Sequence, residues 1–233
     1  MISQDIRSNR DRYLAIMAEH GTLAPQDIVA SVSETQADLH AVFSSASVEV
    51  AARKPAPNEW CLLELVRHAA FTERLVGKLI HHLARDAYPS AEDFEGAGIG
   101  MMPDDDHGYA EVLDDLALKN AALLDEVRDL PDAPNVEMKA DHPFFGPLNC
   151  KEWAGFQRVH DLDHIQHARK ILADIGGWAD ARHSPSPTSD SHPGRPRGRL
   201  TPLPEGDGSK RHSIEAQPPE VRARMLARAS TQM

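Results

Sequence analysis

Apolar residues in the first 180 positions recur at intervals of three and four, the spacing of one face of an α-helix, and strand-like alternation is nearly absent. This pattern predicts four amphipathic helices: Pro25 to about Arg53, Cys61 to about Arg85, Asp104 to about Leu130, and a last one from Asn149 to Gly176–Gly177. We therefore predict an all-α protein, a four-helix bundle with long crossover connections.

Local residue choices support the predicted helix ends. Pro55 and Pro57 cannot continue a helix and separate the first two segments. The aspartates at 104–106 suit a helix N-terminus, where carboxylates meet the positive end of the helix dipole. Asn149 followed by Glu152 has the form of a capping box at the start of the last helix.

Composition divides the chain into three parts. Residues 181–233 contain no Phe, Trp or Tyr and hold 8 of the 17 prolines, so we predict a disordered Pro/Arg-rich C-terminal tail. Residues 1–24 form a predicted N-terminal amphipathic extension, and residues 25–180 form the bundle.

Charge and hydropathy exclude several functions. The tail has a net charge of +4 and the first 180 residues have −15, so the folded part would repel a phosphate backbone and is not expected to bind nucleic acid. The chain lacks an apolar run of the ~18 residues that a membrane span needs, and its charged N-terminus does not resemble a secretory signal. We expect a cytoplasmic protein with no membrane association.

The stretch RVHDLDHIQHARKI carries the candidate chemistry, because His160, His164 and His167 recur at steps of four and three. On a helix they share a stripe with Trp153 and Phe156, which should face the bundle interior. Two imidazoles one helical turn apart can bind one cation. A hydrogen-bonded core network of histidines, or partial exposure to solvent, explains the same spacing.

Helix two offers a further histidine on its apolar stripe, His68 in NEWCLLELVRHAAFTERLV. Metal sites in bundles are built from side chains on facing helices. Asp161 and Asp163 fall toward the flanks of the histidine stripe, where a carboxylate could orient an imidazole.

Two stretches resemble the DinB-like (YfiT-like) superfamily: KPAPNEWCLLELVRHAAFTERLV, and DHPFFGPLNCKEWAGFQRVHDLDHIQHARKI with its HPFFG, EW and histidine pair. The resemblance covers roughly residues 25–175. It implies a four-helix bundle, often a homodimer, that holds a divalent metal through His68, His160 and His164. The chain departs from the closest branch at Asp163, where a histidine is usual, and at His167, where glutamine is usual. His167 is therefore a candidate fourth ligand, or with Asp163 an orienting residue around the ligands.

The resemblance implies an enzyme class. Members include thiol transferases that use a low-molecular-weight thiol, and metal-dependent hydrolases. Three histidines leave a metal position open for water or substrate; zinc is the default ion, and nickel or iron also suit imidazole. We expect a transferase or hydrolase that activates a small thiol or water against a small-molecule substrate.

Other interpretations stay open. One is a non-catalytic bundle in which a metal or histidine network is structural or senses stress; another is a metal-free module that binds an apolar ligand. His142 and Phe144–Phe145 could line the mouth of the site or could be structural. Cys61 and Cys150 show no metal-binding spacing, and structural roles are favoured for both.

Overall fold

The computed structural model describes residues 7–90, 92–93 and 107–176. Its elements are α2 (Arg10–Thr22), α3 (Pro25–Ser44), α4 (Val48–Ala51), α5 (Leu62–Leu83), α6 (Tyr109–Arg128), β1 (Ala140–His142), β2 (Gly146–Leu148) and α7 (Cys150–Asp174). The predicted tail at 181–233 and the aspartates at 104–106 lie outside the described residues.

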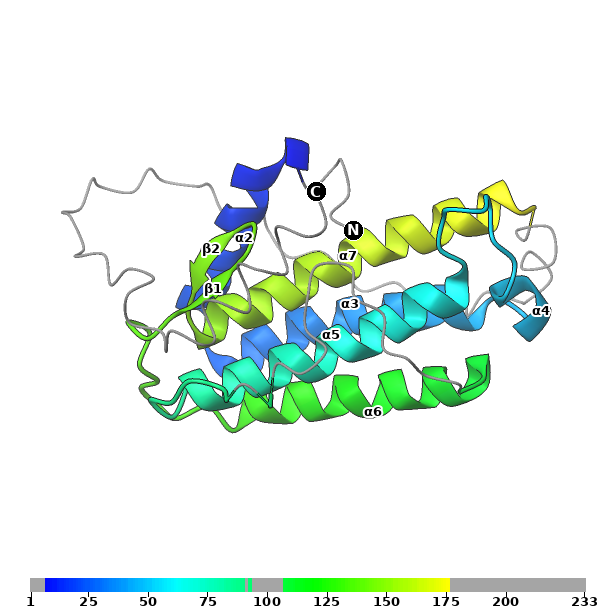
Figure 1. Cartoon of the computed structure of the whole chain (residues 1–233). Coiled ribbons are helices and arrows are strands. Elements are labelled where there is room, and N and C mark those ends of the chain that lie inside the picture. The colour runs from blue at the N-terminus through cyan, green and yellow to red at the C-terminus, as the bar shows by residue number, and fades with distance from the viewer. Residues whose placement is uncertain (1–6, 91, 94–106, 177–233) are drawn as a thin grey trace, which may run out of the picture.

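The four long helices α3, α5, α6 and α7 lie side by side along one axis and form the predicted four-helix bundle (Figure 1). Helix α5 packs against α6 and α7, and α3 packs against the same two helices. Each long helix therefore buries a stripe against two neighbours, which explains why the apolar spacing of the sequence is helical throughout.

Helices α5 and α6 begin at the same end of the bundle. Arg67, near the start of α5, donates a hydrogen bond to the carbonyl oxygen of His107 at 2.6 Å, just before α6. Tyr109, the first residue of α6, donates from its hydroxyl to the carbonyl oxygen of Phe43 near the end of α3 at 2.7 Å. The connection from α5 to α6 therefore joins opposite ends of the bundle, as predicted for a crossover.

Two helix boundaries differ from the prediction. The first long helix ends at Ser44 instead of near Arg53, and a short helix follows because the Ser47 side chain accepts a hydrogen bond from the N–H of Val50. Helix α6 begins at Tyr109, since Glu111 accepts the N–H of Gly108 at 2.8 Å and caps the helix there. Ser47 and Glu111 accept hydrogen bonds from backbone N–H groups that, in a longer helix, would have bonded to carbonyl oxygens of the helix itself.

The two short strands were not predicted. They pair antiparallel, with Ala140 opposite Leu148 and His142 opposite Gly146, immediately before α7. Gly146 has φ of +88°, a left-handed conformation that glycine adopts without the steric cost of a Cβ atom. Three-residue strands are too short for alternating hydrophobicity to reveal.

The N-terminal helix α2 packs against α7 near the β-hairpin (Figure 1). A Cβ atom added at Gly155 of α7 would lie 2.9 Å from Cβ of His20 and 3.0 Å from Cα of Met17, so glycine permits this close approach. At the hairpin, the Arg10 guanidinium donates to the carbonyl oxygens of Phe144 and Phe145, both at 3.2 Å.

The apolar core forms two clusters along the bundle. One includes Val32, Val76 and Leu123, and the other includes Leu39, Ala69, Leu116 and Ile165. Buried polar residues lie where the clusters meet on each long helix, and we call them the carboxyl–amide cluster: Gln36, Glu73, Asn120, Gln157 and Asp161.

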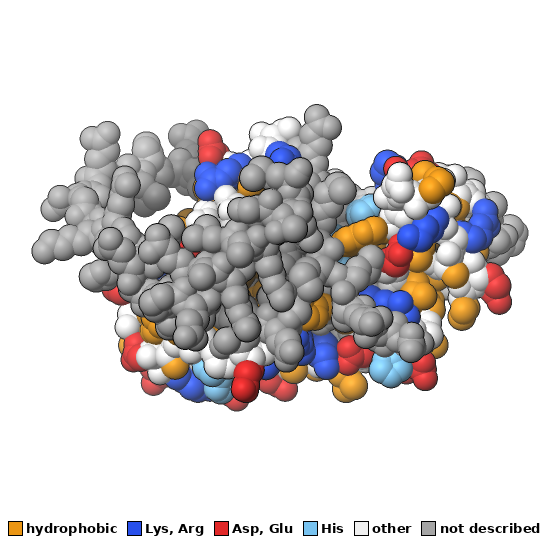
Figure 2. Space-filling view, viewed as in Figure 1, with side chains coloured by type: hydrophobic (Ala, Val, Ile, Leu, Met, Phe, Trp, Pro, Cys, Tyr) orange, Lys and Arg blue, Asp and Glu red, His pale blue; other side chains and the backbone are white. Residues whose placement is uncertain are grey.

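Acidic and basic side chains are mixed along the edge of the molecule formed by α6 (Figure 2). Lys119 and Asp115 form an ion pair at 3.0 Å on this helix. None of the helices in the described ranges is both long and apolar enough to cross a membrane.

Candidate metal centre

Helices α5 and α7 carry the candidate site, and hydrogen bonds fix the first turn of each. Glu64 accepts the N–H of Cys61 at 2.8 Å at the start of α5. Asn149 accepts the N–H groups of Lys151 and Glu152, both at 3.0 Å, while Glu152 accepts the N–H of Asn149 at 2.9 Å. The capping box predicted for the last helix is therefore present, and it sets where α7 begins.

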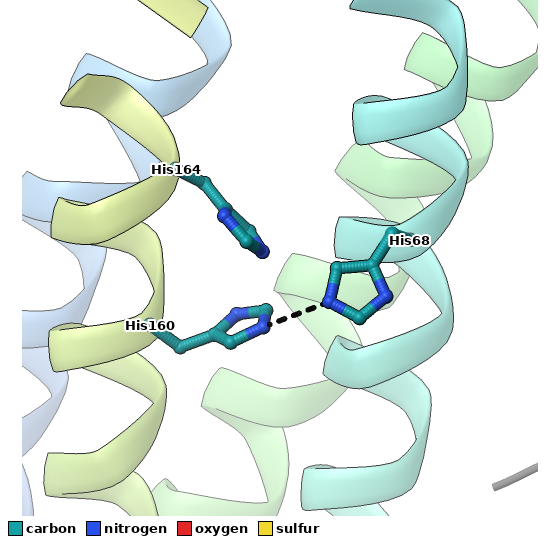
Figure 3. Close-up of side chains that lie close together, drawn as sticks. All are labelled: His68, His160 and His164. Atoms are coloured by element: carbon teal, nitrogen blue, oxygen red, sulfur yellow. Dashed lines mark hydrogen bonds between the residues drawn. The ribbon is translucent and has the colours of Figure 1, made fainter. Parts of the chain in front are cut away.

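His68 on α5 faces His160 and His164 on α7, and the three rings point toward one another (Figure 3). In the described part of the chain, these residues form a group that offers one ring nitrogen each, all within 4.8 Å of one another. We call them the histidine cluster. The structure thus brings together the three residues that the family resemblance named as ligands.

The spacing within the histidine cluster suits a small cation. The Nε2 atoms of His68 and His160 are 3.3 Å apart. Two nitrogens bound to one zinc ion, each at about 2.0–2.1 Å and with a tetrahedral angle, would lie about 3.3–3.4 Å apart. The observed distance therefore allows one ion between these two rings without moving either helix.

Three ring nitrogens of the cluster have no hydrogen-bond partner in the described part of the chain. Both ring nitrogens of His164 and Nδ1 of His160 are buried without a hydrogen bond to any described residue. Buried ring nitrogens are normally paired, because leaving them unpaired costs desolvation energy. A group that accepts nitrogen lone pairs, such as a metal ion, would satisfy such atoms.

Burial keeps the imidazoles of His160 and His164 neutral. It lowers the pKa of His160 from the usual 6.5 to about 3. The pKa of His164 is also well below its ordinary value, first because of burial and then because of the neighbouring histidines 160, 68 and 167. A metal binds the neutral ring, so no proton has to be displaced near pH 7.

His167 and Asp163 lie outside the group of converging ligand atoms. The ring of His167 stacks on Trp60, with centroids 6.1 Å apart and planes at 22°, and is 6.5 Å from the ring of His164. Trp60 also contacts His68, with centroids 5.1 Å apart. Trp60 and His167 therefore border the cluster on one side. Asp163 is buried on α7.

Aromatic rings border the cluster on another side. The ring of Phe156 lies 5.6 Å from that of His160 and 4.5 Å from that of His142. Nδ1 of His142 accepts the N–H groups of Phe144 and Phe145, both at 3.1 Å, so the ring proton of neutral His142 is on Nε2. The hairpin residues that the sequence singled out thus reach the cluster through Phe156.

Sequence reasoning missed most of the carboxyl–amide cluster. Glu73 and Asp161 are both fully buried, although Asp161 was expected on the flank of its helix. Burial, and then Asp161, raise the pKa of Glu73 well above its ordinary value, and burial raises the pKa of Asp161 to about 8. The available signal was the placement of Glu73 between Ala69 and Val76 on an apolar stripe.

Cys61 and Cys150 are buried and form no disulfide. Burial is the largest influence on both thiols and raises the pKa of each. A thiol with a raised pKa is a poor nucleophile at neutral pH, because the thiolate is the reactive form. Structural roles for both cysteines agree with this environment.

Comparisons with known proteins identify the family. The sequence profile of the DinB superfamily matches residues 31–168. No curated protein matches the chain.

Two solved structures are similar. One is TT2238, described as a four-helix bundle protein, with 23% identity and a TM-score of 0.45 over 62% of this chain and 99% of that one. The other is YfiT from Bacillus subtilis, described as a probable metal-dependent hydrolase with an unusual four-helix bundle topology. It has 16% identity and a TM-score of 0.45 over 65% of this chain and 87% of that one.

Proposed function

The chain belongs to the DinB superfamily, and we propose that it is a metal-dependent transferase or hydrolase whose divalent metal is held by His68, His160 and His164. The observation that carries the proposal is the convergence of three imidazoles from two helices, with both ring nitrogens of His164 and Nδ1 of His160 buried and unpaired among the described residues. Zinc suits this donor set best, and nickel or iron also bind imidazole.

Three neutral ligands leave the charge of a divalent ion undiminished and at least one coordination position open. Such an ion lowers the pKa of a bound water or thiol, which makes either a nucleophile near neutral pH. The reaction we propose is attack by a small thiol or water on an electrophilic small molecule.

The surrounding side chains would shape the substrate site. Trp60 and His167 border the histidine cluster on one side, and Phe156 with His142 borders it on another. The side chain of His160 is 12% exposed, so solvent reaches the cluster there. We propose that substrate enters between these two aromatic borders.

A reconstitution experiment tests the proposed function. Metal-free protein is loaded with zinc, nickel or iron and assayed with low-molecular-weight thiols and electrophiles, and with ester and amide substrates without thiol. We expect turnover with at least one ion, and its loss in His164→Ala. The matched control is His40→Ala, which removes an exposed histidine from α3 and should keep full activity.

The burial of the cluster favours a second candidate, a non-catalytic bundle with a structural or stress-sensing metal. His68 and His164 are 7% and 3% exposed, which limits access to an ion between them. A protein that binds metal stoichiometrically but shows no turnover across the whole panel would favour this candidate over the enzyme.

A further inference from the structure

Two adjacent residues of α7 each have an unpaired buried polar atom. Nδ1 of His160 and Oδ2 of Asp161 are buried, and neither has a hydrogen-bond partner among the described residues. The other carboxylate oxygen, Oδ1, lies 3.9 Å from Nδ1 of His160. A hydrogen bond needs about 2.7–3.2 Å, so an approach of about 1 Å would pair these groups.

A hydrogen-bonded network that draws on all four long helices holds the Asp161 carboxyl in this position. Gln157 donates from Nε2 to Oδ1 of Asp161 at 2.7 Å and to Oε1 of Glu73 at 3.0 Å. Gln36 donates to both carboxyl oxygens of Glu73, at 3.2 and 3.3 Å. Asn120, with its amide nitrogen turned toward Glu73, donates to Oε1 at 3.0 Å. Gln36 of α3, Glu73 of α5 and Asn120 of α6 thus belong to the network that places the Asp161 carboxyl beside His160.

We propose that Asp161 is a positioning residue for His160. Its carboxyl group accepts the Nδ1–H of His160, keeps the ring proton on Nδ1, and leaves the Nε2 lone pair directed at His68 and the metal position. The metal in this inference rests on the proposed function, whereas the position of the ring proton does not.

The arrangement of the cluster agrees with this tautomer. Nε2 of His160 faces Nε2 of His68 at 3.3 Å, so without metal one of these nitrogens is the donor and the other the acceptor. A proton on Nδ1 of His160 makes its Nε2 the acceptor, which is also the state that binds a metal. A carboxylate paired with the far nitrogen of a metal-binding imidazole orients the ring and increases its basicity.

Asp161 and Glu73 are a matched pair for the test. Both carboxyls are fully buried in the same hydrogen-bonded cluster, and Asp161 is the one beside His160. Asp161→Asn keeps an oxygen acceptor but cannot ionise, and Asp161→Leu removes the acceptor as well. Glu73→Gln makes the same chemical change as Asp161→Asn without touching His160.

Long-range ¹H–¹⁵N NMR of the histidine rings in metal-free protein tests the tautomer, with the His160→Gln spectrum assigning the signal. We expect the His160 proton on Nδ1 in wild type and in Asp161→Asn, and its shift to Nε2 in Asp161→Leu. A proton on Nε2 in wild type, or on Nδ1 in a folded Asp161→Leu, would contradict the proposal.

Zinc affinity, measured by competition with a chromophoric chelator, tests the consequence for the metal. Asp161→Asn should weaken binding by about 10- to 100-fold, the usual effect of mutating an outer partner, because an amide cannot ionise to support the ring as a carboxylate does, and Glu73→Gln by less than about 3-fold. Equal losses in both variants, or none in Asp161→Asn, would overturn the positioning role. Wild-type protein that binds no zinc, nickel or iron would refute the proposed function instead, and the NMR result would still decide the tautomer.

Discussion

The histidine cluster and the carboxyl–amide cluster are adjacent, and both draw on α5 and α7 for buried polar side chains. They differ in how their hydrogen bonds are satisfied. Both carboxyls of the second cluster receive amide N–H groups from within the protein, although Oδ2 of Asp161 and Oε1 of Gln157 have no partner among the described residues. In the histidine cluster, both nitrogens of His164 have no partner in the described part of the chain.

This difference separates two uses of buried polar groups. A buried network whose members satisfy one another helps to specify how helices align, because a shifted helix would leave polar groups unpaired. A buried group that stays unpaired costs stability, and such groups concentrate where a ligand completes them. We therefore interpret the carboxyl–amide cluster as mainly internal and the histidine cluster as the place where an external group binds.

The largest effect is expected from breaking the carboxyl–amide cluster. Gln157→Leu removes the amide that bridges Glu73 and Asp161 and leaves two buried carboxyls facing each other. We expect a loss of about 3–5 kcal/mol in the free energy of unfolding, because leaving a buried hydrogen-bonding group unpaired costs about 1–3 kcal/mol and Gln157 bonds to two carboxyls. Urea denaturation followed by circular dichroism measures this loss.

Gln166→Leu is the matched control, because Gln166 is exposed on the same helix. Its effect should stay within about 0.5 kcal/mol, as for most surface substitutions. Similar losses in the two variants would show that Gln157 has no special role in the core.

A smaller effect on stability is expected from binding of a metal ion at the histidine cluster. An ion that binds the folded state alone stabilises it by about 2.7 kcal/mol when the free concentration is 100 times Kd. Zinc should therefore raise the Tm of wild type and of His40→Ala, and chelation should reverse the rise. His164→Ala should show no such rise, and an equal rise in His164→Ala would place the binding elsewhere.

The smallest expected effect is the pH dependence of stability. The contributions of the two clusters to the free energy of unfolding change with pH in opposite directions. The pKa of His160 falls on folding from 6.5 to about 3, so its contribution to stability is present above pH 6.5 and is lost as pH falls toward 3. The pKa of Asp161 rises from 3.8 to about 8, so its contribution is lost as pH rises through that range.

His160→Gln isolates the histidine contribution. Between pH 7 and 5, metal-free wild type should lose about 2 kcal/mol more unfolding free energy than this variant, since protons bind the unfolded imidazole alone in that window. Urea unfolding at several pH values in the presence of a chelator measures the difference. Equal losses in wild type and variant would mean that His160 is not held neutral by burial.

The sequence was sufficient for the bundle and for the histidine cluster. Apolar residues at three- and four-residue intervals indicated the long helices, and Asn149 with Glu152 marked the start of α7. The histidines on α7 share a stripe because a helix has 3.6 residues per turn. Their partner, His68, was a candidate from its place on the apolar stripe of the second helix, and the family resemblance joined it to His160 and His164, because periodicity does not reveal which helices face each other.

The carboxyl–amide cluster could not be predicted in the same way. Glu73 and Asp161 are 88 positions apart in the sequence, and each is an ordinary charged residue on an amphipathic helix. If either helix were rotated about its axis by one residue position, the side chain of Glu73 or Asp161 would face solvent. Their burial depends on how four helices pack, which is a tertiary property that local patterns do not encode.

Metal content is the most direct test of the central claim that the histidine cluster binds a divalent metal. Tag-free protein and its His160→Ala variant are purified and measured by plasma mass spectrometry. We predict about one metal per chain in wild type and less than about 0.2 in the variant, because three convergent ligands are the fewest found in such sites. Less than about 0.2 metal per chain in wild type, or equal content in both proteins, would contradict the claim.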